Sequence, residues 1–141
     1  MILTVEKNKD RLLQYWWDER QMPRWFTESN GMGLHTDEDF LDFCSKMKVI
    51  YEVGDCAVYV EESGNMHLSK LRGAKIDVET VYALRDELLD IPCLFAWVCG
   101  RNWGLKRLLK AWGFTFDGLV MRYGSSHGKV LKWECYKLVA T

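Results

Sequence analysis

A few side chains of the sequence have the chemistry needed to take up a proton near neutral pH. His67 lies between Met66 and Leu68, so in a strand its side chain points to the opposite face from theirs. Imidazole titrates near neutral pH, and Glu61 and Glu62 stand a few residues earlier, so these three residues are candidates for a general base. A partly exposed strand histidine without a catalytic role explains His67 equally well.

A second group of residues has the character of an anion site. Lys70, Arg72 and Lys75 surround Gly73 and Ala74, directly before a predicted helix. A helix N-terminus offers backbone N–H groups and the positive end of the helix dipole, and three added cations can hold a phosphate there. The alternative is a solvated basic turn that binds nothing.

The cysteines and the other histidines predict neither a metal site nor a disulfide framework. No CxxC pair occurs, so we expect reduced thiols packed as small hydrophobic side chains in a cytoplasmic protein. His35 and His127 fall in a loop and a turn, without the spacing of a metal site or a catalytic triad. The five cysteines are Cys44, Cys56, Cys93, Cys99 and Cys135.

Length and charge limit the classes of function. The 141 residues suit one domain, 1–141, with a core of its own. The net charge of −1 argues against a general nucleic-acid binder, although Arg101, Lys106, Arg107 and Lys110 form a local basic group. No apolar run is long enough to span a membrane, and no signal peptide or lipidation motif is recognisable.

The elements that must position these residues follow from periodicity. The first half predicts a strand, two helices and an antiparallel meander: Met1–Val5, Asn8–Met22, a helix opening at Thr36 with Asp39 in a capping box, Val49–Val53, Cys56–Glu61 and Asn65–Leu71. The second half predicts helix Asp77–Ile91, buried strand Leu94–Cys99, helix Asn102–Trp112 and strands Thr115–Tyr123 and Val130–Val139. Gly54 suits a type II′ turn in the meander, and Arg24–His35 and Ser125–Gly128 are expected to be loops.

This element order predicts an α/β fold. The sheet is expected to be mixed, an antiparallel meander followed by a parallel crossover, with helices on both faces. Within this order, the segment from Gly100 to Phe114 carries Asn102, followed by Gly113-Phe114 eleven and twelve residues later. The order and this spacing resemble the GNAT superfamily of N-acetyltransferases.

The resemblance implies an acyltransferase that uses acetyl-CoA and an amine acceptor. It assigns Asn102 to the pantetheine arm, although a helix N-cap explains this residue as well. It assigns the segment Lys70–Lys75, through Lys70, Arg72, Gly73 and Ala74, to the cofactor pyrophosphate. The amine proton then requires a base, for which His67 and Glu61 are the candidates.

Two positions depart from the family pattern. Lys75 stands where the pyrophosphate loop needs a residue without a bulky side chain, and Leu109 stands where many of these enzymes place a tyrosine as general acid. Leucine cannot donate a proton, and losing a positioned acid costs about 10²–10⁴ in rate.

The departures leave a second function open, a catalytically inactive GNAT-fold protein that is structural or host-modulating. The layout is also similar to the GNAT-like internal virion protein of tailed bacteriophages, which would place the chain in a virion. An aromatic group near Pro23 suits an acceptor pocket, a core cluster or a patch for a protein partner. Its members are Trp16, Trp17, Trp25 and Phe26.

Overall fold

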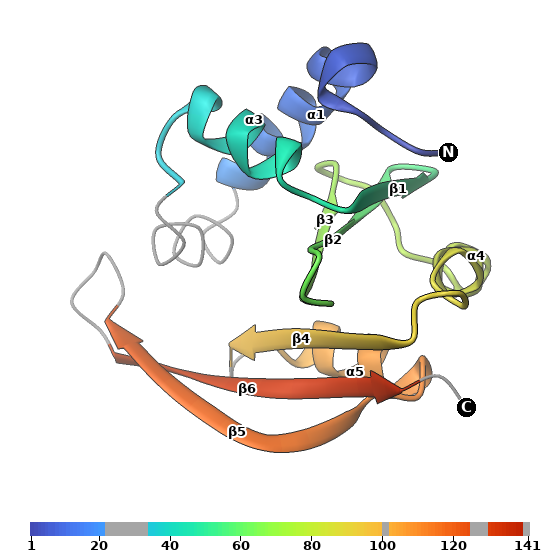
Figure 1. The fold of residues 1–141 in the computed structure, drawn as a ribbon, viewed down its shortest axis with the longest axis vertical. Helices are drawn as coiled ribbons and strands as arrows, with labels where there is room; N and C mark the ends of the chain where they lie inside the picture. The colour runs from blue at the N-terminus through green and yellow to red at the C-terminus, as the bar shows by residue number, and fades with distance from the viewer. Residues whose placement is uncertain (22–33, 100–101, 125–129, 140–141) are drawn as a thin grey trace.

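The computed structural model describes residues 1–21, 34–99, 102–124 and 130–139. Within these ranges the chain forms four helices and two three-stranded sheets (Figure 1). In chain order the elements are α1 (Val5–Arg20), α3 (Asp37–Ser45), β1 (Val49–Val53), β2 (Cys56–Val60), β3 (Met66–Lys70), α4 (Val78–Glu87), β4 (Cys93–Cys99), α5 (Trp103–Ala111), β5 (Thr115–Gly124) and β6 (Val130–Val139).

The predicted first strand, Met1–Val5, is wrong. Thr4 is the N-cap of α1, and its hydroxyl accepts a hydrogen bond from the Lys7 N–H at 3.2 Å, so the helix begins at Val5. Extended pairing is limited to an isolated antiparallel bridge between Ile2 and Tyr51. The predicted helix Asn8–Met22 is present in α1, whose start lies three residues earlier.

The second helix begins as predicted. Thr36 accepts from the Asp39 N–H at 3.0 Å, and the Asp39 carboxylate accepts from the Thr36 N–H at 3.1 Å, which completes the capping box. The predicted loop after α1 falls mainly on residues 22–33 and the predicted turn Ser125–Gly128 on residues 125–129, so both lie largely outside the described residues.

The predicted meander is confirmed. β1, β2 and β3 pair antiparallel in that order, and Gly54 at the β1–β2 turn has φ +59° while no other residue type among those described has a positive φ. This combination fits the type II′ turn, which needs a positive φ at its first central residue alone. The second sheet has the order β4-β6-β5, and both of its pairs are also antiparallel.

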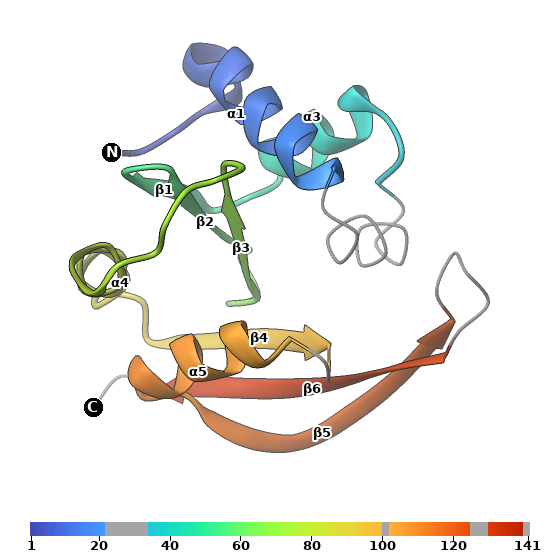
Figure 2. The same cartoon turned by 180° about the vertical axis from the view of Figure 1, so that it is seen from behind.

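The α/β class agrees with the prediction, but the strands of the described residues form two antiparallel sheets in place of the predicted single mixed sheet. The parallel pairing recorded among these residues is an isolated bridge between Asn65, which directly precedes β3, and Phe95 of β4. The Phe95 N–H donates to the Gly64 carbonyl at 2.9 Å. Beyond this bridge the two strands diverge, and Figures 1 and 2 show the first sheet standing at a steep angle to the second. Gly64 is required here, because a Cβ at this position would lie 2.6 Å from the Cys93 carbonyl oxygen.

Helices cover both faces of the first sheet. α1 and α3 pack on one face through a cluster that includes Ile50, Ala57 and Tyr59. The opposite face, with Val58 and Val60, packs against α4, α5 and β4. All of β2 is consequently buried. α5 lies on the second sheet, in front of β4 and β6 in Figure 2.

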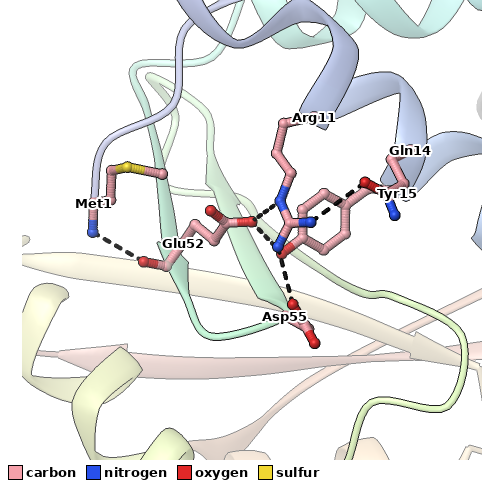
Figure 3. Close-up of polar contacts among 6 residues, drawn as sticks. All are labelled: Met1, Arg11, Gln14, Tyr15, Glu52 and Asp55. Carbon is pink, nitrogen blue, oxygen red and sulfur yellow. Dashed lines mark hydrogen bonds and ion pairs between the residues drawn. The ribbon is translucent and has the colours of Figure 1, made fainter.

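A polar cluster around Glu52 fixes α1 over the first sheet (Figure 3). The Glu52 carboxylate accepts from Arg11 Nε at 2.7 Å and from the Tyr15 hydroxyl at 2.6 Å, and its side chain is only 6% exposed. Arg11 also pairs with Asp55 in the β1–β2 turn at 3.0 Å. Burial and the bond to Glu52 raise the pKa of Tyr15, so this hydroxyl stays protonated as a donor.

Candidate active site

A cleft of about 1220 Å³ lies where β3 and β4 diverge. One wall is formed by β3, the loop that follows it and the start of α4. The other wall is formed by β4, the start and outer face of α5, and Trp133 of β6. Both predicted functional segments, the basic loop and the start of the Asn102 helix, contribute to this cleft.

Only some of the residues predicted to bind phosphate in the basic loop line the cleft. Lys70, Ala74 and Lys75 line the cleft, whereas Arg72 and Gly73 are not among the lining residues. The Lys70 ammonium turns back on the loop and donates to the Ala74 carbonyl at 3.2 Å. The Arg72 guanidinium donates to the Gln21 amide oxygen of α1 at 2.8 Å.

Four backbone N–H groups of this segment, those of Lys70, Leu71, Arg72 and Ala74, are bound inside the protein. Two of them meet carboxylates from the end of α1: the Lys70 N–H donates to Glu19 at 2.7 Å and the Arg72 N–H to Asp18 at 3.1 Å. Those of Leu71 and Ala74 donate to the carbonyls of Asp55 and Leu71, both at 3.0 Å. The carboxylates of Glu19 and Asp18 thus accept hydrogen bonds from backbone N–H groups of the loop that was predicted to bind a phosphate.

Glu19 is a site residue that the sequence analysis missed. Its side chain lines the cleft, yet the residue is only 7% exposed. Burial raises the pKa of Glu19 to about 7, although hydrogen bonds from the Lys70 N–H and the Ser69 hydroxyl act in the opposite direction. No local pattern could reveal this contact, because Glu19 and Lys70 lie 51 positions apart.

Asn102 has the position that the sequence predicts. It is the N-cap of α5, and its side-chain oxygen accepts from the Leu105 N–H at 3.2 Å. It also lines the cleft, next to Gly104 and Leu105. The capping role and a place in the cleft therefore coexist in this residue.

The structure brings the two predicted catalytic residues together. His67 Nε2 lies 2.8 Å from a Glu61 carboxylate oxygen, and the ring of Phe43 meets the imidazole edge-on with centroids 5.1 Å apart. The His67 side chain is 22% exposed and lines the cleft. The contact with the Glu61 carboxylate holds the imidazole in one orientation.

Two tryptophans and two basic residues complete the cleft, and of these four only Lys75 was part of a predicted ligand site. Trp97 and Trp133 lie on one face of the second sheet, since Trp97 pairs with Cys135 and Cys99 pairs with Trp133. The exposed Arg107 stands on α5, on the same wall as the tryptophans, and the exposed Lys75 stands on the opposite wall.

Leu109, at the position where the resemblance expects a tyrosine, is fully buried in the core. Leu105, Arg107 and Leu108 are among the α5 residues that line the cleft, and Leu109 is not. The hydroxyl-bearing residues among those described that line the cleft are Ser69 and Tyr82.

The remaining sequence candidates lie elsewhere. Trp16 packs on Phe40 in the core, and the indole N–H groups of Trp16 and Trp17 both donate to Asp37, at 3.1 and 3.0 Å. Trp25, Phe26 and His127 lie outside the described residues. No group of three potential metal ligands occurs in the described part of the chain, and no helix there is long and apolar enough to cross a membrane.

Comparison with solved structures identifies the class of fold. The chain superposes on a GNAT-family acetyltransferase from Streptococcus pneumoniae with a TM-score of 0.66 and 14% identity, covering 100% of this chain and 99% of the other. A candidate acetyltransferase from Acinetobacter baylyi gives 0.67 and 12%, covering 99% and 89%. A candidate phosphinothricin N-acetyltransferase gives 0.65 and 14%, covering 100% and 98%.

The chain thus has the fold of GNAT-family acetyltransferases along its length. Identities of 12–14% establish the fold alone, and fold does not fix activity. No protein-family model matches the sequence, and the curated proteins include no significant match. What the cleft does must be argued from its own residues.

Proposed function

We propose that the protein is a CoA-dependent N-acyltransferase, which moves an acyl group such as acetyl from acyl-CoA to the amine of a small molecule or a protein. The observation that carries this proposal is the cleft between the diverging strands β3 and β4, which His67 and Asn102 both line. The fold shared with acetyltransferases supports it. We expect such an enzyme to act in the cytoplasm.

The chemistry is an attack of the neutral amine nitrogen on the thioester carbonyl carbon. The C–N bond forms, the C–S bond breaks, the thiolate leaves, and the amine nitrogen must lose a proton. His67 can take up that proton at Nδ1 while its Nε2–H donates to Glu61 at 2.8 Å. Glu61 then acts as a positioning residue that stabilises the imidazolium.

Backbone groups of β3 suit the stabilisation of the carbonyl oxygen. The Lys70 N–H points away from β2, because it donates to Glu19. N–H directions alternate along an antiparallel strand, so we expect the N–H of Leu68 to point the same way, into the cleft that this residue lines. The thiolate leaves without an acid at Leu109, which is buried in the core.

The first test is the binding of acetyl-CoA by calorimetry, followed by thiol release with a panel of amines. Micromolar binding, about −8 kcal/mol, is expected to weaken in Asn102→Ala. His67→Gln is expected to lower kcat about 10²–10⁴-fold with unchanged acetyl-CoA affinity, because it removes the base and leaves the donor site. Equal kcat values for His67→Gln and the parent protein would exclude His67 as the base.

A second candidate function, a catalytically inactive GNAT-fold protein, is favoured by one observation. Carboxylates of Asp18 and Glu19 hold loop N–H groups that a phosphate would otherwise use. In this alternative the protein is structural or host-modulating, for example a bacteriophage virion component. Absence of acetyl-CoA binding at millimolar concentration would favour this alternative over the acyltransferase.

A further inference from the structure

The charged side chains around the cleft suggest where an anionic ligand binds. Five such groups line it: Glu19, Lys70, Lys75, Asp77 and Arg107. Glu19 is held by the loop, and the Lys70 ammonium donates to the Ala74 carbonyl at 3.2 Å. Asp77 caps α4, where its carboxylate accepts from the Thr80 N–H at 2.8 Å.

Lys75 and Arg107 differ from the other three groups. Both are exposed, and neither forms an ion pair with another residue of the described ranges. Lys75 lies in the loop before α4 and Arg107 on α5, so they stand on the two walls of the same cleft. The N–H groups of Lys70, Leu71, Arg72 and Ala74, in contrast, already have acceptors, and the one bound to the Lys70 N–H is the buried carboxylate of Glu19.

A phosphate group that reached the Lys70 N–H would have to displace Glu19 and would meet its negative charge when Glu19 is ionised. Removing a buried carboxylate from its donors is costly. A phosphate between Lys75 and Arg107 meets two exposed cations that do not have to leave an ion pair within the described residues, and guanidinium suits paired phosphate oxygens. The second position is therefore the favourable one.

We propose that the phosphate-bearing end of the acyl donor is bound by the side chains of Lys75 and Arg107 across the cleft, and that Glu19 keeps it away from the backbone of the Lys70–Ala74 loop. This inference rests on the proposed function for the identity of the ligand. Lys75, which departs from the family pattern in the sequence, becomes a binding residue.

Calorimetry with acetyl-CoA, S-acetylpantetheine and inorganic pyrophosphate tests this assignment. Lys75→Gln and Arg107→Gln are each expected to weaken acetyl-CoA and pyrophosphate binding about tenfold, and to leave S-acetylpantetheine, which has no phosphate, unchanged. Lys110→Gln is the matched control, because Lys110 is exposed on α5 but does not line the cleft. The affinity for acetyl-CoA should also fall with added salt.

Glu19→Gln tests the role of the Glu19 charge separately from the two cations. Glutamine keeps an acceptor for the Lys70 N–H and removes the negative charge. It is expected to tighten acetyl-CoA binding about threefold. The assignment would be overturned if Arg72→Gln weakened acetyl-CoA binding while Lys75→Gln and Arg107→Gln had no effect. It would also be overturned if pyrophosphate did not bind at millimolar concentration.

The two proposals fail in different ways. If the protein transfers acyl groups but neither Lys75→Gln nor Arg107→Gln changes its affinity for acetyl-CoA, this inference is wrong and the proposed enzymatic activity stands. Acetyl-CoA bound through the two cations, with no transfer to any amine, would keep this inference and remove the proposed activity.

Discussion

At the scale of single residues, the carboxylate of Glu19 is the least expected group in the cleft. It comes from the last turn of α1 and binds a loop more than fifty positions away. Glu19 accepts hydrogen bonds from the Lys70 N–H and the Ser69 hydroxyl. These two bonds offset only part of the free-energy cost of burying the Glu19 charge. This cost is a property of the folded state, so it makes stability depend on pH.

Glu19→Gln is expected to raise the thermal midpoint by roughly 5 °C at pH 8 and hardly at all at pH 4.5. The folded-state pKa is raised from an ordinary value of 4.5 to about 7, so between these values the folded protein keeps a proton that the unfolded chain releases. The contribution of Glu19 to the free energy of unfolding therefore falls as the pH rises from 4.5 to about 7, and Glu19→Gln removes this loss.

Thermal unfolding at the two pH values measures this difference. Glu62→Gln, at an exposed position, is the control and should shift the midpoint equally at both. A gain from Glu19→Gln that is larger at pH 4.5 than at pH 8 would contradict the sign of the argument.

At the scale of elements, the sequence predicts those features that depend on residues close together in the chain. The capping box of Thr36 and Asp39 and the turn at Gly54 were predicted, because each depends on residues within three positions. The start of α1 was missed, since the weak alternation of Met1–Val5 concealed an N-cap at Thr4. Contacts between distant segments, such as Glu19 with Lys70 or Trp97 near Trp133, leave no local pattern to read.

The attachment of α1 to the first sheet is expected to depend on Glu52. Glu52→Ala leaves the Tyr15 hydroxyl and the Arg11 guanidinium without their shared acceptor, and it should lower the free energy of unfolding by about 3 kcal/mol. Asp55→Ala removes an exposed partner of the same arginine and should cost less than about 1 kcal/mol.

Urea denaturation of both variants measures the two losses. Equal losses would mean that the buried position of Glu52 adds nothing to its ion pair with Arg11. Because α1 also carries Asp18 and Glu19, we expect Glu52→Ala to loosen the basic loop as well.

At the scale of the whole molecule, the cleft lies where the two sheets of the described residues meet at the parallel bridge of Asn65 and Phe95 and then separate. The sequence predicted the meander and the buried strand that make up these sheets, and it assigned both to a single mixed sheet. At the bridge between them, the backbones of Gly64 and Cys93 approach closely, which no periodicity in the sequence records.

Gly64→Ala is expected to cost at least about 3 kcal/mol in stability, because it adds backbone strain at φ +92° to a 2.6 Å contact with the Cys93 carbonyl oxygen. Gly54→Ala is the matched control. It has a positive φ of +59° but no atom within 4 Å of the new Cβ, so it should cost only about 1 kcal/mol.

Chemical denaturation separates the two contributions, since the difference between the variants reports the contact between the sheets. Variants of equal stability would show that the two sheets can move apart at the bridge without loss. A stable Gly64→Ala protein with weakened acetyl-CoA binding would instead show that the new side chain has changed the width of the cleft.

The wall formed by Trp97 and Trp133 gives the molecule an optical property. Indole emission responds to the polarity and water content of its surroundings, and both rings line the cleft. A ligand that fills the space between β3 and β4 displaces water beside them, so the unlabelled protein carries its own fluorescent indicator of occupancy. That signal needs no knowledge of the acceptor, and a collection of amines can be screened by emission before any turnover is sought.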